Sequence, residues 1–193
     1  MRKENNSATR PGGGMSTRSL AYCALLAAIS VILARLVIPM PNASTRFSIE
    51  AVPIYMAGML FGPVAGGSVG FCADLVGCMF SGYGYNPIFC IPPIVYGVFG
   101  GVFRWYLSKG VSIGRLILGF IPPVVLGSIL YQSAALAFIY NSKGTFMPSL
   151  VFFLSTRSVQ FAITLVLDAL VIHLLFRGKV FEHLGVWPPK ARK

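Results

Sequence analysis

The feature that most constrains this chain is an apolar stretch, residues 46–77, that is interrupted near its middle by Gly62-Pro63. Proline lacks the backbone N–H that a helix interior needs, so the pair divides the stretch into two short helices. Charged residues stand near both ends of the stretch, Arg46 and Glu50 at the start and Asp74 towards the end. A helix that only anchors a protein in the membrane does not need these charged residues, whereas membrane proteins that carry solutes use them.

The composition places the whole chain in a membrane. Of its 193 residues, 55% are hydrophobic and only 11% are charged, and the mean hydropathy is +0.74. Soluble domains have about a quarter of their residues charged. Since a span needs about 20 apolar residues, the length suits six spans with short loops. We therefore expect an all-α integral membrane protein, a compact bundle of six transmembrane helices.

Proline and glycine pairs and polar loops separate the expected spans. A polar, Gly-rich segment, residues 1–15, reads as a disordered tail, and residues 179–193 form a basic tail. Between them, residues 16–178 form one membrane domain. Its expected spans are approximately residues 16–38, 47–61, 64–80, 88–107, 115–140 and 147–176.

The basic residues predict the orientation. The chain carries a net charge of +11, and twelve of its 16 Lys and Arg residues lie in or beside the two tails and the loop between spans four and five. Basic loops stay on the cytoplasmic side, so we expect both termini to be cytoplasmic. Because the charge is spread over these loops instead of a soluble domain, its expected partner is membrane lipid and not nucleic acid.

Signals of catalysis are missing from the sequence. It has no nucleotide-binding glycine loop, no histidine pair at metal-ligand spacing and no nucleophile motif, so we expect no enzyme activity, no catalytic residue, no metal and no cofactor. The four cysteines lie in or beside apolar segments, where they suit packing. A disulfide between Cys78 and Cys90 is left open.

The last span carries a polar stripe. Arg157, Gln160, Thr164 and Asp168 follow one another at spacings of three, four and four residues, which places them on one helix face. The helical rise sets the first and last about 16 Å apart. The stripe is interpreted as the wall of a ligand cavity that opens to the outside. The alternative is a set of interhelical hydrogen bonds, with Asp168 paired to an arginine.

Three arginines gather in the outer half of the expected bundle. Arg35 lies near the end of span one, Arg46 in the following loop, and Arg157 in span six. The guanidinium fork pairs with carboxylates and stacks on rings, so these residues suit an anionic or planar ligand. Arginines that reach out to the membrane interface are the plainer alternative.

Three further side chains are candidates for the same ligand site. Asp74 either contacts ligand or pairs with an arginine and braces the bundle. Phe47 and Tyr96 supply aromatic surface for a flat heterocycle, or belong to the aromatic belt of the membrane interface.

Small residues mark one face of the first span. Ala24 and Ala28 are four residues apart, which allows another helix to approach closely. This pattern fits packing within the bundle, and it fits docking to a partner membrane subunit.

Together these motifs resemble a known family, the substrate-binding S components of energy-coupling factor (ECF) vitamin transporters, over residues 16–178. Within that family the chain is most similar to the folate-specific branch. The resemblance rests on Arg46-Phe47, Pro53-Ile54, Ala57-Gly58, Leu60-Phe61-Gly62-Pro63, Gly66, Gly70, Asp74-Leu75 and Tyr96-Gly97.

The resemblance implies a function that composition does not. Such proteins sit in the bacterial plasma membrane and bind a vitamin, here folate, from outside. They dock through small residues of the first helix, which match Ala24 and Ala28, onto a transmembrane coupling subunit that carries two ATPase subunits. The loop between the first two spans acts as a gate, and it corresponds to residues 39–46.

Other functions remain open on the sequence alone. Riboflavin, thiamine or a queuosine precursor would also use aromatic and polar side chains. A membrane scaffold without a ligand would pair its polar groups internally. An enzyme acting on lipid would need a catalytic constellation that the sequence does not offer.

Overall fold

A computed structural model of the chain describes residues 15–35, 38–39, 46–47, 49–81, 85–139, 146–178, 181 and 187. The regular structure of these residues is helical apart from one antiparallel pair of two-residue strands, β1 (Ile38–Pro39) and β2 (Arg46–Phe47), so the expected all-α class is confirmed. The helical elements are α1 (Thr17–Leu33), α2 (Ala51–Phe61), α3 (Pro63–Ser81), α4 (Pro87–Val102), α5 (Arg104–Ser108), α6 (Ile113–Pro123), the π-helix η1 (Val124–Tyr131), α7 (Gln132–Ile139) and α8 (Phe146–Arg177).

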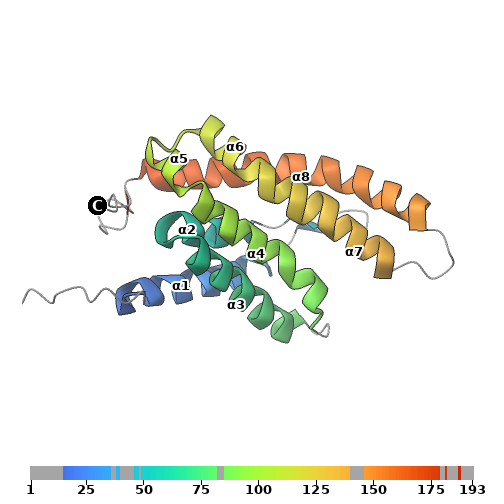
Figure 1. Ribbon diagram of the computed structural model, residues 1–193, viewed down its shortest axis with the longest axis horizontal. Coiled ribbons are helices and arrows are strands. Elements are labelled where there is room, and N and C mark those ends of the chain that lie inside the picture. Colours follow the sequence, from blue (N-terminus) through green and yellow to red (C-terminus); the bar gives the residue numbers. More distant parts are fainter. Residues whose placement is uncertain are drawn as a thin grey trace, which may run out of the picture.

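The helices lie in two groups joined by α4 (Figure 1). Helix α8 runs along the molecule beside α6 and α7, and α1, α2 and α3 pack together on the other side. Helix α4 contacts both groups, α2 and α3 on one side and α6 and η1 on the other. The start of α1, the short α5 and the end of α8 lie at the same end of the bundle. This arrangement suits the expected topology, although which side of the membrane this end faces remains a prediction.

Three segments are long and apolar enough to cross a membrane: Pro63–Phe80, Ile113–Ile139 and Phe146–Arg177. The three other apolar helices, α1, α2 and α4, have between 10 and 17 residues. Helix α2, with 11 residues, is only about 16 Å long, about half the thickness of the hydrocarbon core. The expected count of six crossings stays a prediction.

The hairpin around Gly62-Pro63 forms as expected, but its first helix starts later than expected. Gly62 has a φ of 105°, a left-handed conformation that favours glycine, and its N–H closes α2 on the Gly58 carbonyl at 2.8 Å. The second span was expected from Phe47, and this is wrong: α2 begins at Ala51, and Phe47 pairs with Ile38 in the strand pair. Pro53 fits the late start, because the first turn of a helix is where proline costs least.

Helices α2, α3 and α4 pack backbone against backbone through glycines. A methyl group added at Gly97 of α4 would fall on the carbonyl of Gly66 in α3, and one added at Gly58 of α2 would fall on the carbonyl of Gly97. Several residues that carry the family resemblance, Gly58, Gly66, Gly70 and Gly97, are therefore contact points of these three helices. Close approach of this kind is the role of small residues between membrane helices.

Pro122-Pro123 does not end the fifth segment but changes its winding. Helix α6 ends at Pro123 and continues directly into η1 and α7. Two successive prolines remove two backbone donors, and the hydrogen-bond register shifts to the wider π form. The buried side of η1 includes Gly127 and Ser128.

The two tails are described only in small part. Residues 1–14 of the expected disordered tail lie outside the described residues. Of the expected basic tail, Phe181 and Trp187 are described, and both rings pack against Phe176 at the end of α8, at centroid distances of 4.8 and 5.4 Å. All four cysteines are free thiols, so the disulfide between Cys78 and Cys90 is not formed.

Candidate functional site

The polar stripe of α8 faces the interior of the bundle, as the sequence predicts. Arg157, Gln160, Thr164 and Asp168 are 8%, 6%, 8% and 1% exposed, although the helix between them exposes many apolar side chains. Polar groups that would be costly in lipid are thus turned inward. The Thr164 hydroxyl donates to the Gln160 carbonyl at 3.1 Å, a bond within the helix itself.

Polar groups from three other parts of the chain join this stripe. The Tyr96 hydroxyl of α4 and the Ser128 hydroxyl of η1 share a hydrogen bond of 3.0 Å. The charges of Asp168, Glu50 and Arg157 all act on Tyr96, which places these side chains in one region. We call this set the interior polar cluster, and it consists of Glu50, Tyr96, Ser128, Arg157, Gln160, Thr164 and Asp168.

Aromatic rings lie beside the interior polar cluster. Tyr55 of α2 stacks on Phe120 of α6 with centroids 3.9 Å apart and planes 24° apart, and Tyr96 lies 6.3 Å from Phe120 at a tilt of 56°. Tyr55 and Phe120 are fully buried. The arrangement places aromatic ring faces next to hydrogen-bonding groups. This combination suits a flat molecule and is common in small-molecule sites.

Asp168 is the most deeply buried member of the α8 stripe and has an unsatisfied oxygen. Its side chain is 1% exposed, and Oδ1 has no hydrogen-bond partner among the described residues. The alternative of an ion pair with an arginine is also not seen in the described part of the chain. A buried acceptor without a donor costs about 1–3 kcal/mol, and more when it is charged. A donor from outside the chain would remove this cost, so Asp168 is suited to contact a ligand.

Arg157 lies at the other end of the stripe. Its guanidinium carbon is 5.6 Å from the centroid of the Phe161 ring, one helical turn further along α8. The cation–π contact holds the guanidinium of this buried residue within the bundle.

Arg35 and Asp74 have partners away from the cluster. An Arg35 guanidinium nitrogen donates to the carbonyl of Gly77 and so ties the end of α1 to α3. Asp74 shares a side-chain hydrogen bond with Cys90, which joins α3 to α4, and no arginine of the described residues pairs with it. The structure therefore places neither residue beside the α8 stripe.

Two further candidates, Arg46 and Phe47, are described only in their backbone. They form β2 and pair with Pro39 and Ile38 respectively. Their side chains, like residues 40–45 of the expected gate, lie outside the described part of the structure.

Ala24 and Ala28 lie on an exposed face of α1. Large apolar side chains surround them on this helix, with Leu20, Leu25 and Ile32 exposed by 60%, 56% and 62%. The face is open to lipid or to another helix.

The two hollows found among the described residues lie away from the interior polar cluster, and the outward cavity expected from the sequence stays a prediction. The described residues form a hollow of about 500 Å³ near the ends of α5 and α8 and another of about 350 Å³ between the start of α4 and the α7–α8 pair. Neither is lined by a member of the cluster.

Sequence reasoning missed two members of the site. Glu50 stands at the edge of an apolar segment, where a charge is costly to bury, but the sequence pattern indicated no role for it. Ser128 gave no signal, because its bond to Tyr96 depends on how α4 meets the π-helix.

Comparison with known proteins gives one family match. The family described as "ECF-type riboflavin transporter, S component" matches residues 14–177. The folate transporter FolT of Clostridium novyi (strain NT) is 31% identical over 100 residues, which are 51% of this chain and 56% of that protein. The match thus spans only about half the length of this relative.

Solved structures share the fold. A crystal structure of FolT bound with folic acid has a TM-score of 0.63 at 25% identity, over 79% of this chain and 91% of the other. ThiT from Listeria monocytogenes has a TM-score of 0.62 at 17% identity, over 83% and 94% of the two chains. The S-component for biotin from an ECF-type ABC transporter has a TM-score of 0.55 at 18% identity, over 85% and 95%. The last two show the fold alone.

Proposed function

This chain belongs to the family of ECF-type riboflavin transporter S components, and from that premise we propose that it is the vitamin-binding subunit of a transporter and that its substrate is folate. The resemblance drawn from its motifs is thereby confirmed at the level of the family. It is an integral membrane protein of a transport family and not an enzyme. The substrate and the partners are the proposed part.

The observation that supports a flat, polar substrate is the buried, unpartnered Oδ1 of Asp168 beside the rings of Tyr55, Tyr96 and Phe120. A pterin ring presents N–H donors along one edge and two aromatic faces. In the proposed complex, Asp168 accepts from the ring edge, and the aromatic side chains contact the ring face.

Charge favours folate over riboflavin, the vitamin in the family's description. Folate carries a glutamate tail with two carboxylates, whereas riboflavin carries no charged group. Arg157 at the far end of the stripe is placed to meet such a tail, because guanidinium groups pair well with carboxylates. Arg46, expected from the sequence, would meet the tail nearer the mouth, with Phe47 beside it, whereas Arg35 ties α1 to α3 through the Gly77 carbonyl. Asp74 has a bracing role in this proposal, through its bond to Cys90.

Titration calorimetry on the purified protein tests the substrate. We expect one folate per chain, bound at least about tenfold more tightly than riboflavin, since loss of one charged pairing is worth about that factor. Pteroate, which lacks the glutamate tail, should lie between them. Tighter binding of riboflavin would overturn the folate assignment, and no binding of any vitamin would favour the scaffold function.

The proposal includes the partners implied by the family. The chain would dock through Ala24 and Ala28 on a transmembrane coupling subunit that carries two ATPase subunits. Both termini would be cytoplasmic, and the loop at residues 39–46 would gate the outer face. The exposed small-residue face of α1 supports the docking surface.

Replacing Ala24 by leucine should block docking without affecting the substrate. Leucine on this exposed face would keep a partner helix from approaching, so recovery of the assembled complex should fall by about tenfold or more. Folate affinity of the isolated subunit should stay within about twofold, because the substituted side chain points out of the bundle.

Ala162→Leu is the matched control. Ala162 is also an exposed alanine in an apolar helix, but it lies on α8. Assembly should tolerate this change. Equal loss of assembly with both variants would remove the specific role of α1.

A further inference from the structure

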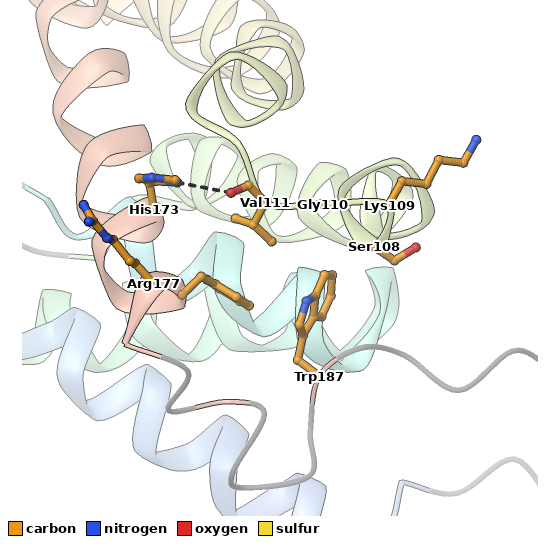
Figure 2. Close-up of a pocket in the computed structure, with 8 residues that line it drawn as sticks. Ser108, Lys109, Gly110, Val111, His173, Arg177 and Trp187 are labelled. Atoms are coloured by element: carbon orange, nitrogen blue, oxygen red, sulfur yellow. Dashed lines mark hydrogen bonds between the residues drawn. The ribbon is translucent and has the colours of Figure 1, made fainter.

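A second hollow, separate from the interior polar cluster, lies where α5 and α8 end (Figure 2). Its volume is about 500 Å³, within the range of about 300–1,000 Å³ that is common for ligand sites. Its lining comes from α5, from the turn that follows it, from the end of α8 and from the C-terminal segment. The side chains used below are Lys109, His173, Phe176, Arg177 and Trp187.

The polar part of this hollow is cationic. Lys109 and Arg177 line it from opposite sides, with their charged ends pointing outward in Figure 2, and none of the described residues that line it is acidic. His173 is held in place by a 3.1 Å hydrogen bond between Nδ1 and the Val111 carbonyl. Because a carbonyl only accepts, Nδ1 carries the proton, and Nε2 is the remaining polar atom of the ring. The side chains therefore suit a negatively charged group.

The remaining wall is apolar and held by packing. Trp187 is 7% exposed, and its ring meets Phe176 edge-on at 75° with centroids 5.4 Å apart. Its backbone N–H donates to the Phe181 carbonyl at 3.2 Å, which links the two described residues of the C-terminal segment. On the last turns of α8, Leu174 and Leu175 are exposed by 55% and 40%. Apolar surface thus continues from the hollow along the outside of the helix.

The position of the hollow indicates which anion it receives. Helix α8 has 32 residues and is about 48 Å long, so its end reaches beyond a hydrocarbon core of about 30 Å. We assign the surplus length to the end that carries Arg177, which would bring the hollow to the level of the lipid headgroups, beside the exposed leucines. Basic hollows between helices at this level are typical headgroup sites.

We propose that this hollow binds the phosphate headgroup of an anionic phospholipid, with the side chains of Arg177 and Lys109 turned inward from its two sides to meet the phosphate and the acyl chains along Leu174 and Leu175 of α8. A soluble phosphate ion would use the cations but leave the apolar surface without a partner. The bound lipid would also cover Trp187 and fix the C-terminal segment against the end of the bundle.

The two tryptophans of the chain make this site directly measurable. Trp105 is 55% exposed on α5 and does not line the hollow, so Trp105→Phe leaves Trp187 as the only tryptophan. This variant is reconstituted in bilayers that contain either phosphatidylglycerol or phosphatidylcholine with brominated acyl chains, and quenching of Trp187 is followed. Brominated phosphatidylglycerol should quench Trp187 at about a fivefold lower mole fraction than brominated phosphatidylcholine. This is the factor expected for one basic side chain at an anionic surface.

Charge variants in the same background identify the site. Arg177→Gln should remove about fivefold of the preference, and Lys109→Gln should lower it in the same direction. Arg18→Gln removes an exposed arginine at the same end of the bundle, outside the hollow, and should leave the preference within about twofold. For each variant, the mole fractions of the two lipids that give the same quenching are compared as a ratio. A change in the fluorescence of Trp187 that is common to both lipids then cancels.

Three results would overturn the proposal. Equal quenching by the two lipids would show that no headgroup is selected. An equal loss with Arg18→Gln and Arg177→Gln would show only a diffuse surface charge. Protection of Trp187 by millimolar inorganic phosphate, with the lipid preference abolished, would assign the hollow to a soluble phosphate-bearing ligand.

Discussion

Replacing Gly97 by alanine is expected to lower the melting temperature of the protein by about 10 °C. The added methyl group would meet the carbonyl of Gly66 in α3, and the backbone of Gly67 lies close behind it. Since both obstacles are backbone, no side chain can turn aside, and the cost lies near the upper end of overpacking, about 3 kcal/mol. For a chain of this size each kcal/mol shifts the midpoint by about 2–4 °C.

Gly77→Ala is the matched control for this prediction. Gly77 also lies in an apolar helix, α3, but a methyl group added there meets no atom within 4 Å. Alanine is favoured over glycine in a helix interior by up to about 1 kcal/mol, so this variant should melt at the same temperature or higher. Thermal unfolding in detergent, followed by circular dichroism at 222 nm, measures both. A Gly97→Ala protein that melts within about 2 °C of the parent would contradict the glycine contact.

The class of fold and its strongest break were predictable because their signals are local. Hydropathy and the small number of charges indicate apolar helices, and Gly62-Pro63 marks a turn wherever it occurs. The start of α2 was also within reach, because a first turn is where Pro53 costs least, but the expected span was extended to Phe47. The π-helix was not predictable: Pro122-Pro123 signals a disturbance, while its outcome depends on how η1 packs on α4.

The candidate site was predictable only along one helix. The spacing of Arg157, Gln160, Thr164 and Asp168 encodes a single face, and the structure buries that face. Contacts between helices leave no comparable spacing pattern in the sequence. Arg35 bonds to the carbonyl of Gly77, an acceptor that every residue has, and Asp74 bonds to Cys90 instead of an arginine. Charge alone indicated that both needed partners but not which ones.

Asp168→Asn separates the two functions that the sequence left open for the α8 stripe. If Asp168 accepts hydrogen bonds from the substrate ring, asparagine should weaken folate binding by about 100-fold, because a hydrogen bond to a charged group contributes up to about 3 kcal/mol. The ligand-free protein should not melt at a lower temperature. Oδ1 has no partner to lose, and a neutral amide is less costly to bury than a carboxylate.

Opposite effects on affinity and stability are what distinguish a ligand contact from a structural brace. If Asp168 only braced the bundle, its substitution would lower the stability of the protein, and the loss of affinity would follow from that.

Thr164→Val is the matched control, one turn away on the same buried face. Its hydroxyl is already bonded to the Gln160 carbonyl, so affinity should fall by less than about threefold. Calorimetry gives the affinities, and thermal unfolding without folate gives the stabilities. Unchanged folate affinity in Asp168→Asn would remove this residue from the site. A melting temperature lowered by several degrees would assign Asp168 to holding the bundle together, because a loss of 1 kcal/mol already shifts the midpoint by about 2–4 °C.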